Sequence, residues 1–83
     1  MSEHIELIRL KVKPMLNKKV RVYYRRKNTN KHMFVGVVKK INKNSLKLEQ
    51  EDEDQPLKIN IGFRNILKSE DIEIIEPKYY QTT

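Results

Sequence analysis

The hydrophobic pattern of this chain changes its period once, and the change falls close to Pro14. Before that proline, apolar residues recur at spacings of three and four, which is the period of an amphipathic helix. From Val20 onward they recur at every second position, as they do in a strand with one buried face. Because proline ends or kinks a helix, the pattern predicts one short helix over residues 3–12 and only strands after it.

The predicted helix carries a wide apolar stripe. Ile5, Ile8 and Val12 define it, and we expect Leu7 and Leu10 to widen it. The two apolar residues that flank the end of the helix, at positions 15 and 16, continue this face into a turn.

Alternation predicts five short strands over residues 20–25, 33–38, 46–48, 57–63 and 72–75. Gly36 lies inside the second strand, where it predicts a sharp bend or a bulge. Polar runs predict exposed loops over residues 25–31 and 49–54 and a turn over residues 42–45. The expected core of the strands is Val20, Val22, Phe34, Leu46, Leu48, Ile59, Ile61 and Ile72.

A helix followed by five strands in 83 residues predicts a mainly β chain, folded as a small SH3-like or Sm-like barrel. An OB-fold is the second choice, because its usual helix between the third and fourth strands has no counterpart segment here. We expect the helical segment 1–16 to pack on a barrel formed by residues 17–76. Residues 77–83 lack a period and are expected to form a flexible tail.

Two families of small barrels share short motifs with this chain. The run from Phe34 through Gly36 to Val38, followed by Asn44 and Leu46, resembles the first motif of Sm-like RNA-binding proteins. The segment 63–66, which includes a basic residue, is similar to their second motif. The segment 18–22 and the Phe34 to Gly36 run also resemble the C-terminal barrel of the ribosome maturation factor RimP.

A third resemblance covers nearly the whole chain. The run from Asn17 to Val20 resembles the segment that leads from the helix into the first strand of the Veg family, small proteins of Gram-positive bacteria. The segments 59–68 and 72–74 are similar to the aromatic-rich strand and the ending of that family. The resemblance implies an SH3-like or Sm-like barrel and a role in the regulation of gene expression.

Charge is unevenly distributed along the chain, whose formal net charge is +7. Residues 1–48 hold 14 Lys or Arg and 2 Glu, a net of +12, whereas residues 49–83 hold 4 Lys or Arg and 9 Asp or Glu, a net of −5. Proteins that bind polyanions gather positive charge on one surface, because phosphate contact and counterion release drive their affinity. We therefore expect an RNA partner, with DNA as the alternative.

The candidate nucleic-acid-binding residues fall in two groups. The first group, the hairpin patch, combines cations with an outward aromatic, as a platform for unpaired bases requires. Its members are Arg21, Tyr23, Arg25, Arg26, Lys27, Lys31 and His32. The second group, the lysine cluster, surrounds the next turn and consists of Lys39, Lys40, Lys43 and Lys47. Arg64 is added from the motif similar to Sm-like proteins.

Catalysis and metal binding are not expected. The chain has no Cys and two His, and it carries no Gly-rich phosphate loop and no His-Glu-x-x-His motif. The acidic run 49–54 lacks the glycine and the ligand spacing of a Ca²⁺ loop. We therefore expect a cytoplasmic, non-enzymatic binding protein without cofactor, metal or membrane segment. The alternative is an adaptor whose barrel and acidic loop bind a ribosomal or regulatory protein.

Overall fold

The computed structural model describes residues 3–27, 30–51 and 54–75, and its N-terminal helix follows the sequence prediction. Helix α1 (Glu3–Val12) ends at the residue that the position of Pro14 predicts. The proline itself lies in the 3-10 helix η1 (Lys13–Met15). Asn17, with φ 68°, then turns the chain, and its N–H donates to the Val38 carbonyl oxygen at 2.8 Å.

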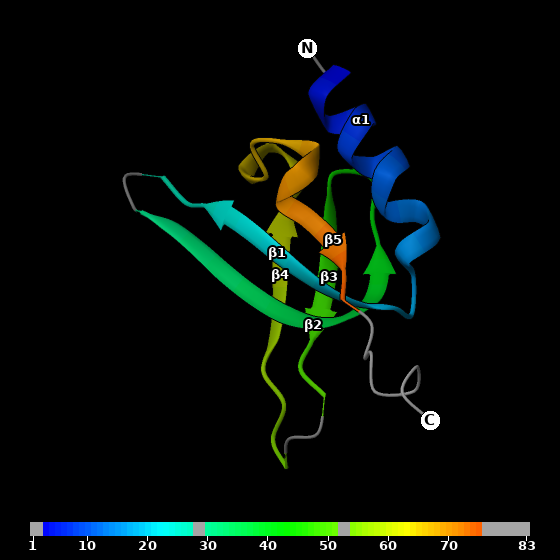
Figure 1. Ribbon diagram of the computed structural model, residues 1–83, viewed down its shortest axis with the longest axis vertical. Helices are drawn as coiled ribbons and strands as arrows, with labels where there is room; N and C mark the ends of the chain where they lie inside the picture. Colours follow the sequence, from blue (N-terminus) through cyan, green and yellow to red (C-terminus); the bar gives the residue numbers. More distant parts are fainter. Residues whose placement is uncertain (1–2, 28–29, 52–53, 76–83) are drawn as a thin grey trace, which may run out of the picture.

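Five antiparallel strands form one sheet in the order β4-β3-β2-β1-β5 (Figure 1). The strands are β1 (Lys19–Arg25), β2 (Lys31–Ile41), β3 (Ser45–Glu49), β4 (Lys58–Gly62) and β5 (Ile72–Ile74). The 3-10 helices η2 (Phe63–Asn65) and η3 (Ser69–Asp71) connect β4 to β5. This arrangement confirms a mainly β chain with an N-terminal helix. Closure into a barrel is not confirmed, because β4 and β5 do not pair with each other within the described residues.

The bulge lies three residues beyond the glycine that suggested it. Strand β2 is long and curved (Figure 1), and its register against β3 shifts between Val38 and Lys40. Gly36 lies in the regular ladder with β1. A Cβ at this position would stand 2.8 Å from the Glu49 carbonyl oxygen and 2.9 Å from Cε2 of Phe34. Glycine is needed there for the close approach of β2 to Glu49 of β3. Of the two predicted features, a bend or a bulge at Gly36, the bulge was wrong in position, while the strand that contains Gly36 is curved.

The helix packs on the sheet through a narrower stripe than predicted. Ile8 and Val12 are buried, whereas the side chains of Leu7 and Leu10 are 64% and 55% exposed. At about 100° per residue, a helix carries Leu7 and Leu10 on the face opposite the buried pair. The prediction that these leucines widen the apolar stripe was therefore wrong.

Most of the predicted strand core is buried, and the links between strands add to it. Phe34 and Ile59 are only partly buried and pack against the core. Phe63 was predicted to end the fourth strand but begins η2, where it is fully buried. The buried residues that the predicted strand core did not include are Tyr24, Val37, Val38, Phe63 and Ile66.

Two side chains attach α1 to the part of the chain that leads from the end of η2 into η3. His4 Nε2 donates to the Ile66 carbonyl oxygen at 2.6 Å, and Lys11 Nζ donates to the Ser69 carbonyl oxygen. These contacts hold the helix at one end of the sheet, beside η2 and η3 (Figure 1). The predicted tail, residues 77–83, lies outside the described residues.

Candidate nucleic-acid interface

The hairpin patch lies where the end of β1 pairs with the beginning of β2. Arg25 pairs with Lys31, and His32 pairs with Tyr24. The predicted loop over residues 25–31 is therefore shorter, since both of its end residues belong to the ladder. Arg25, Lys31 and His32 are exposed there, and Tyr23 lies on the outer face of β1 and is half-buried.

Arg21, the first cation of this patch, is already paired. Register places it directly opposite Glu73 of β5, and its Nη2 donates to Oε2 of that glutamate. This hydrogen bond raises the pKa of the Arg21 guanidinium above its usual value. The expected bidentate phosphate contact would have to displace the carboxylate, so Arg21 is not a free anion-binding fork in this fold.

Lys31 is paired as well, and it covers the expected stacking residue. Its Nζ lies 3.8 Å from Oδ1 of Asp71, a residue that is only 9% exposed. The same ammonium lies 5.7 Å from the centroid of the Tyr23 ring. A cation over the ring occupies one face of Tyr23, which limits the open platform that the sequence predicted for unpaired bases.

Tyr24, which faces the core, holds two further members of the patch. Its ring centroid lies 5.5 Å from that of His32, and the two planes are tilted by 31°. The guanidinium carbon of Arg26 lies 5.7 Å from the same ring. Arg25 and Lys27 are exposed and make no ion pair within the described part of the chain.

The lysine cluster lies at the other end of β2, around its bulge and the β2–β3 turn. Lys40 stands directly opposite Lys47 in the ladder, Lys39 occupies the bulge and Lys43 follows in the turn. For these four lysines, the residues that the structure describes contain no carboxylate within ion-pairing distance. Like charges directly opposite in a ladder destabilise a sheet, and no acid of the described ranges forms an ion pair with either lysine.

Hydrogen bonds order the turn that carries Lys43. The Asn42 N–H donates to the Ser45 carbonyl oxygen at 2.7 Å, and Asn42 Nδ2 donates to Ser45 Oγ at 3.3 Å. The Phe63 N–H donates to the Asn44 carbonyl oxygen at 2.9 Å, which places η2 beside the turn. Arg64 is part of η2 and therefore lies next to the turn of the lysine cluster, where its side chain is exposed.

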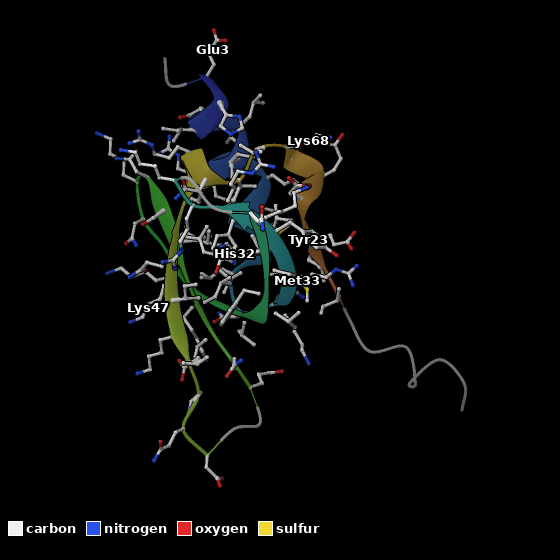
Figure 2. All side chains as sticks on the ribbon, turned by 90° about the vertical axis from the view of Figure 1, so that its left-hand side faces the viewer. Glu3, Tyr23, His32, Met33, Lys47 and Lys68 are labelled. Atoms are coloured by element: carbon white, nitrogen blue, oxygen red, sulfur yellow. The ribbon has the colours of Figure 1, made fainter. Side chains whose placement is uncertain are left out.

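Figure 2 gives a direct view of how the basic side chains divide. Lys47 extends from one side of the sheet, whereas Lys68, in the link between η2 and η3, extends from a different side. Tyr23, His32 and Met33 lie on the β1–β2 hairpin between them in this view. The hairpin patch lies at the start of β2 and the lysine cluster at its end, so the structure separates the predicted basic residues into two surfaces.

A groove that the sequence did not predict adjoins the lysine cluster. It has a volume of about 670 Å³ and lies between α1 and the end of β2. Besides Lys39, Lys40 and Lys43, the helical face formed by Glu6, Arg9, Leu10 and Lys13 lines it. The signal was present in part, since the helical period places Glu6, Arg9 and Leu10 together on one side of α1, whereas Lys13 follows in η1.

Neither metal ligands nor a membrane span is found in the described ranges. Residues 3–27, 30–51 and 54–75 contain no group of three or more His, Asp or Glu arranged to hold a metal ion. Within the same ranges, no helix has the length and apolar character needed to cross a membrane. Comparisons with protein-family models, with curated proteins and with solved structures found no match to this chain.

Proposed function

We propose that this protein binds RNA, as a non-enzymatic cytoplasmic protein, and that the lysine cluster is its main contact surface. The observation that carries the proposal is the Lys40–Lys47 pair, two ammonium groups opposed across a ladder with no carboxylate nearby among the described residues. Such a pair lowers the stability of the free protein, and a bound phosphate removes the repulsion. Lys39 and Lys43 extend the same surface along the bulge and the turn.

The hairpin patch has a smaller role in this proposal than the sequence predicted for it. Two of its cations are paired with carboxylates, and Arg26 and His32 lie against Tyr24. Arg25 and Lys27 remain as additional contacts for a strand that extends beyond the lysine cluster. DNA stays the alternative ligand, because lysine contacts to phosphate do not distinguish the two sugars.

Salt dependence tests the proposal. Four phosphate contacts give a slope of about −2.8 for log affinity against log salt, at about −0.7 per contact on single strands. We expect this slope for a single-stranded RNA of mixed sequence, and a slope smaller in magnitude by about 0.7 for Lys47→Gln. Lys68→Gln, which removes the same charge from a different side of the molecule, is the control and should keep the wild-type slope.

Two results would contradict the proposal. One is a slope near zero with measurable affinity, and the other is an equal loss of slope in Lys47→Gln and Lys68→Gln. A DNA strand of the same sequence measured in parallel decides between the two nucleic acids.

The adaptor alternative and the resemblance to the Veg family stay predictions. Of the acidic loop, Glu51 lies 3.9 Å from Lys19, and residues 52–53 are outside the described part.

A further inference from the structure

The groove beside the lysine cluster combines two properties that a phosphate-binding surface alone does not need. It is lined by three aliphatic side chains, Leu10, Leu16 and Ile41. Leu10 and Leu16 are 55% and 43% exposed, so a large part of their apolar surface faces solvent. Its volume of about 670 Å³ is within the range of roughly 300–1,000 Å³ in which pockets bury most of a small ligand.

Charge around these aliphatic residues is almost entirely positive. Five cations line the groove, namely Arg9, Lys13, Lys39, Lys40 and Lys43. The single acid of the lining, Glu6, already pairs with Arg9 at 2.5 Å. The four lysines make no ion pair within the described residues. A ligand that complements the groove must therefore bring both carboxylates and apolar side chains.

We propose that the groove docks an acidic amphipathic segment of another protein, with aliphatic residues at helical spacing. Such a segment would lay its apolar face on Leu10, Leu16 and Ile41 and direct its carboxylates toward the surrounding lysines. The lining contains no aromatic residue on which a base could stack, and its only guanidinium is paired. Unpaired bases bind best to aromatic platforms, which favours a peptide over a nucleic acid as the occupant.

The docking site goes beyond the proposed function, although the two share Lys39, Lys40 and Lys43. They differ in their other members, because Lys47 is absent from the groove lining and the leucines have no place in a phosphate contact. The shared lysines predict that RNA and the acidic peptide compete for the protein. Because only the peptide contacts the leucines, substitution of a groove leucine should weaken the binding of the peptide and leave the binding of RNA unchanged.

A designed peptide tests this proposal with a control on the same helix. The probe is a Glu-rich helix of about 14 residues, roughly 21 Å long, with Leu on one face. Leu10→Ser should weaken its binding at least about tenfold, since one buried leucine contributes on this scale. Leu7→Ser is the matched control, because Leu7 is 64% exposed on α1 and lies outside the groove lining. It should change the affinity less than about twofold.

Further measurements separate the outcomes. Amide chemical shifts should move at Leu10, Leu16 and residues 41–43 on addition of the peptide to the wild-type chain, which requires no variant to fold. The RNA affinity of Leu10→Ser should equal that of the wild type. Equal losses in Leu7→Ser and Leu10→Ser would overturn the proposal, as would shifts confined to other surfaces. A parallel loss of RNA binding in Leu10→Ser would assign the groove to the nucleic-acid surface and also overturn it.

Discussion

Strand β2 carries basic residues near both of its ends, and the fold pairs these residues with carboxylates at only one end. At its beginning, Lys31 lies 3.8 Å from Asp71, and Arg21 on the neighbouring strand pairs with Glu73. At its far end, Lys40 faces Lys47, and no carboxylate within the described residues pairs with either of them. The acids come from η3 and β5, which lie beside β1 at one edge of the sheet. Whether a cation is free to bind a ligand or is paired with a carboxylate therefore depends on which element lies beside it.

The two ends also differ in what surrounds the cations. At the hairpin, Tyr23 and Tyr24 contact Lys31, Arg26 and His32 through their rings. At the turn, the neighbours are the aliphatic residues of the groove. Aromatic residues made the hairpin patch a predicted platform for unpaired bases, but in the folded chain their rings contact its cations.

The largest effect that we predict concerns the glycine between the two ends. Gly36→Ala should lower the free energy of unfolding by about 2–3 kcal/mol, because the new Cβ would stand 2.8 Å from the Glu49 carbonyl oxygen. Urea denaturation measures the change. Gly62→Ala is the control, because its nearest contact would be 3.5 Å, and we expect a change below about 1 kcal/mol. Similar losses at both glycines would argue against a tight approach of β2 and β3.

The second prediction compares the two groups of cations directly. Lys40→Gln with Lys47→Gln should weaken RNA binding about 25-fold at 0.1 M salt, since each lost contact removes roughly 0.7 log units. Arg21→Gln with Lys31→Gln removes the same charge but should cost less than about threefold, because both cations are already paired. Fluorescence anisotropy with a labelled single strand measures both affinities. The reverse order would make the hairpin patch the interface.

A third experiment removes the acids that neutralise the hairpin. Asp71→Asn with Glu73→Gln should free Lys31 and Arg21 and raise RNA affinity about fivefold, the effect of roughly one added contact. The salt slope should steepen in step. Because Asp71 is nearly buried, thermal unfolding of this variant is measured first, and the affinity is compared where the chain is folded. An unchanged affinity and slope would show that these cations do not reach the ligand.

The smallest predicted effect is a gain in stability. Lys47→Glu converts the opposition with Lys40 into an attraction and should stabilise the free protein by about 0.5 kcal/mol. Lys58→Glu is the counterpart on β4, because Lys58 stands opposite Glu49 and the change creates a repulsion. We expect a loss of similar size there, measured by thermal unfolding at low salt. A loss of stability in Lys47→Glu would remove the argument that this surface carries an uncompensated charge.

The sequence alone determined the succession of elements, because the signals for it are local. The helix over residues 3–12 and the alternation in β1, β3 and β4 follow from side-chain spacing, and the helix ends where Pro14 requires it. The position of Phe63 in η2 did not follow from side-chain spacing, because its burial there depends on packing against distant elements and not on the alternation that precedes it. Leu7 and Leu10 were misjudged although their helical angles place them opposite the buried stripe.

Only the tertiary structure decided which charges remain available to a ligand. Arg21 and Glu73 are 52 residues apart in sequence, and the β1–β5 ladder alone brings them together. The Lys40–Lys47 opposition depends in the same way on the register that the bulge sets between β2 and β3. The groove exists because α1 lies at the end of the sheet where the β2–β3 turn also falls. Spacing along the chain determines which face a residue occupies, but strand pairing determines what stands opposite it.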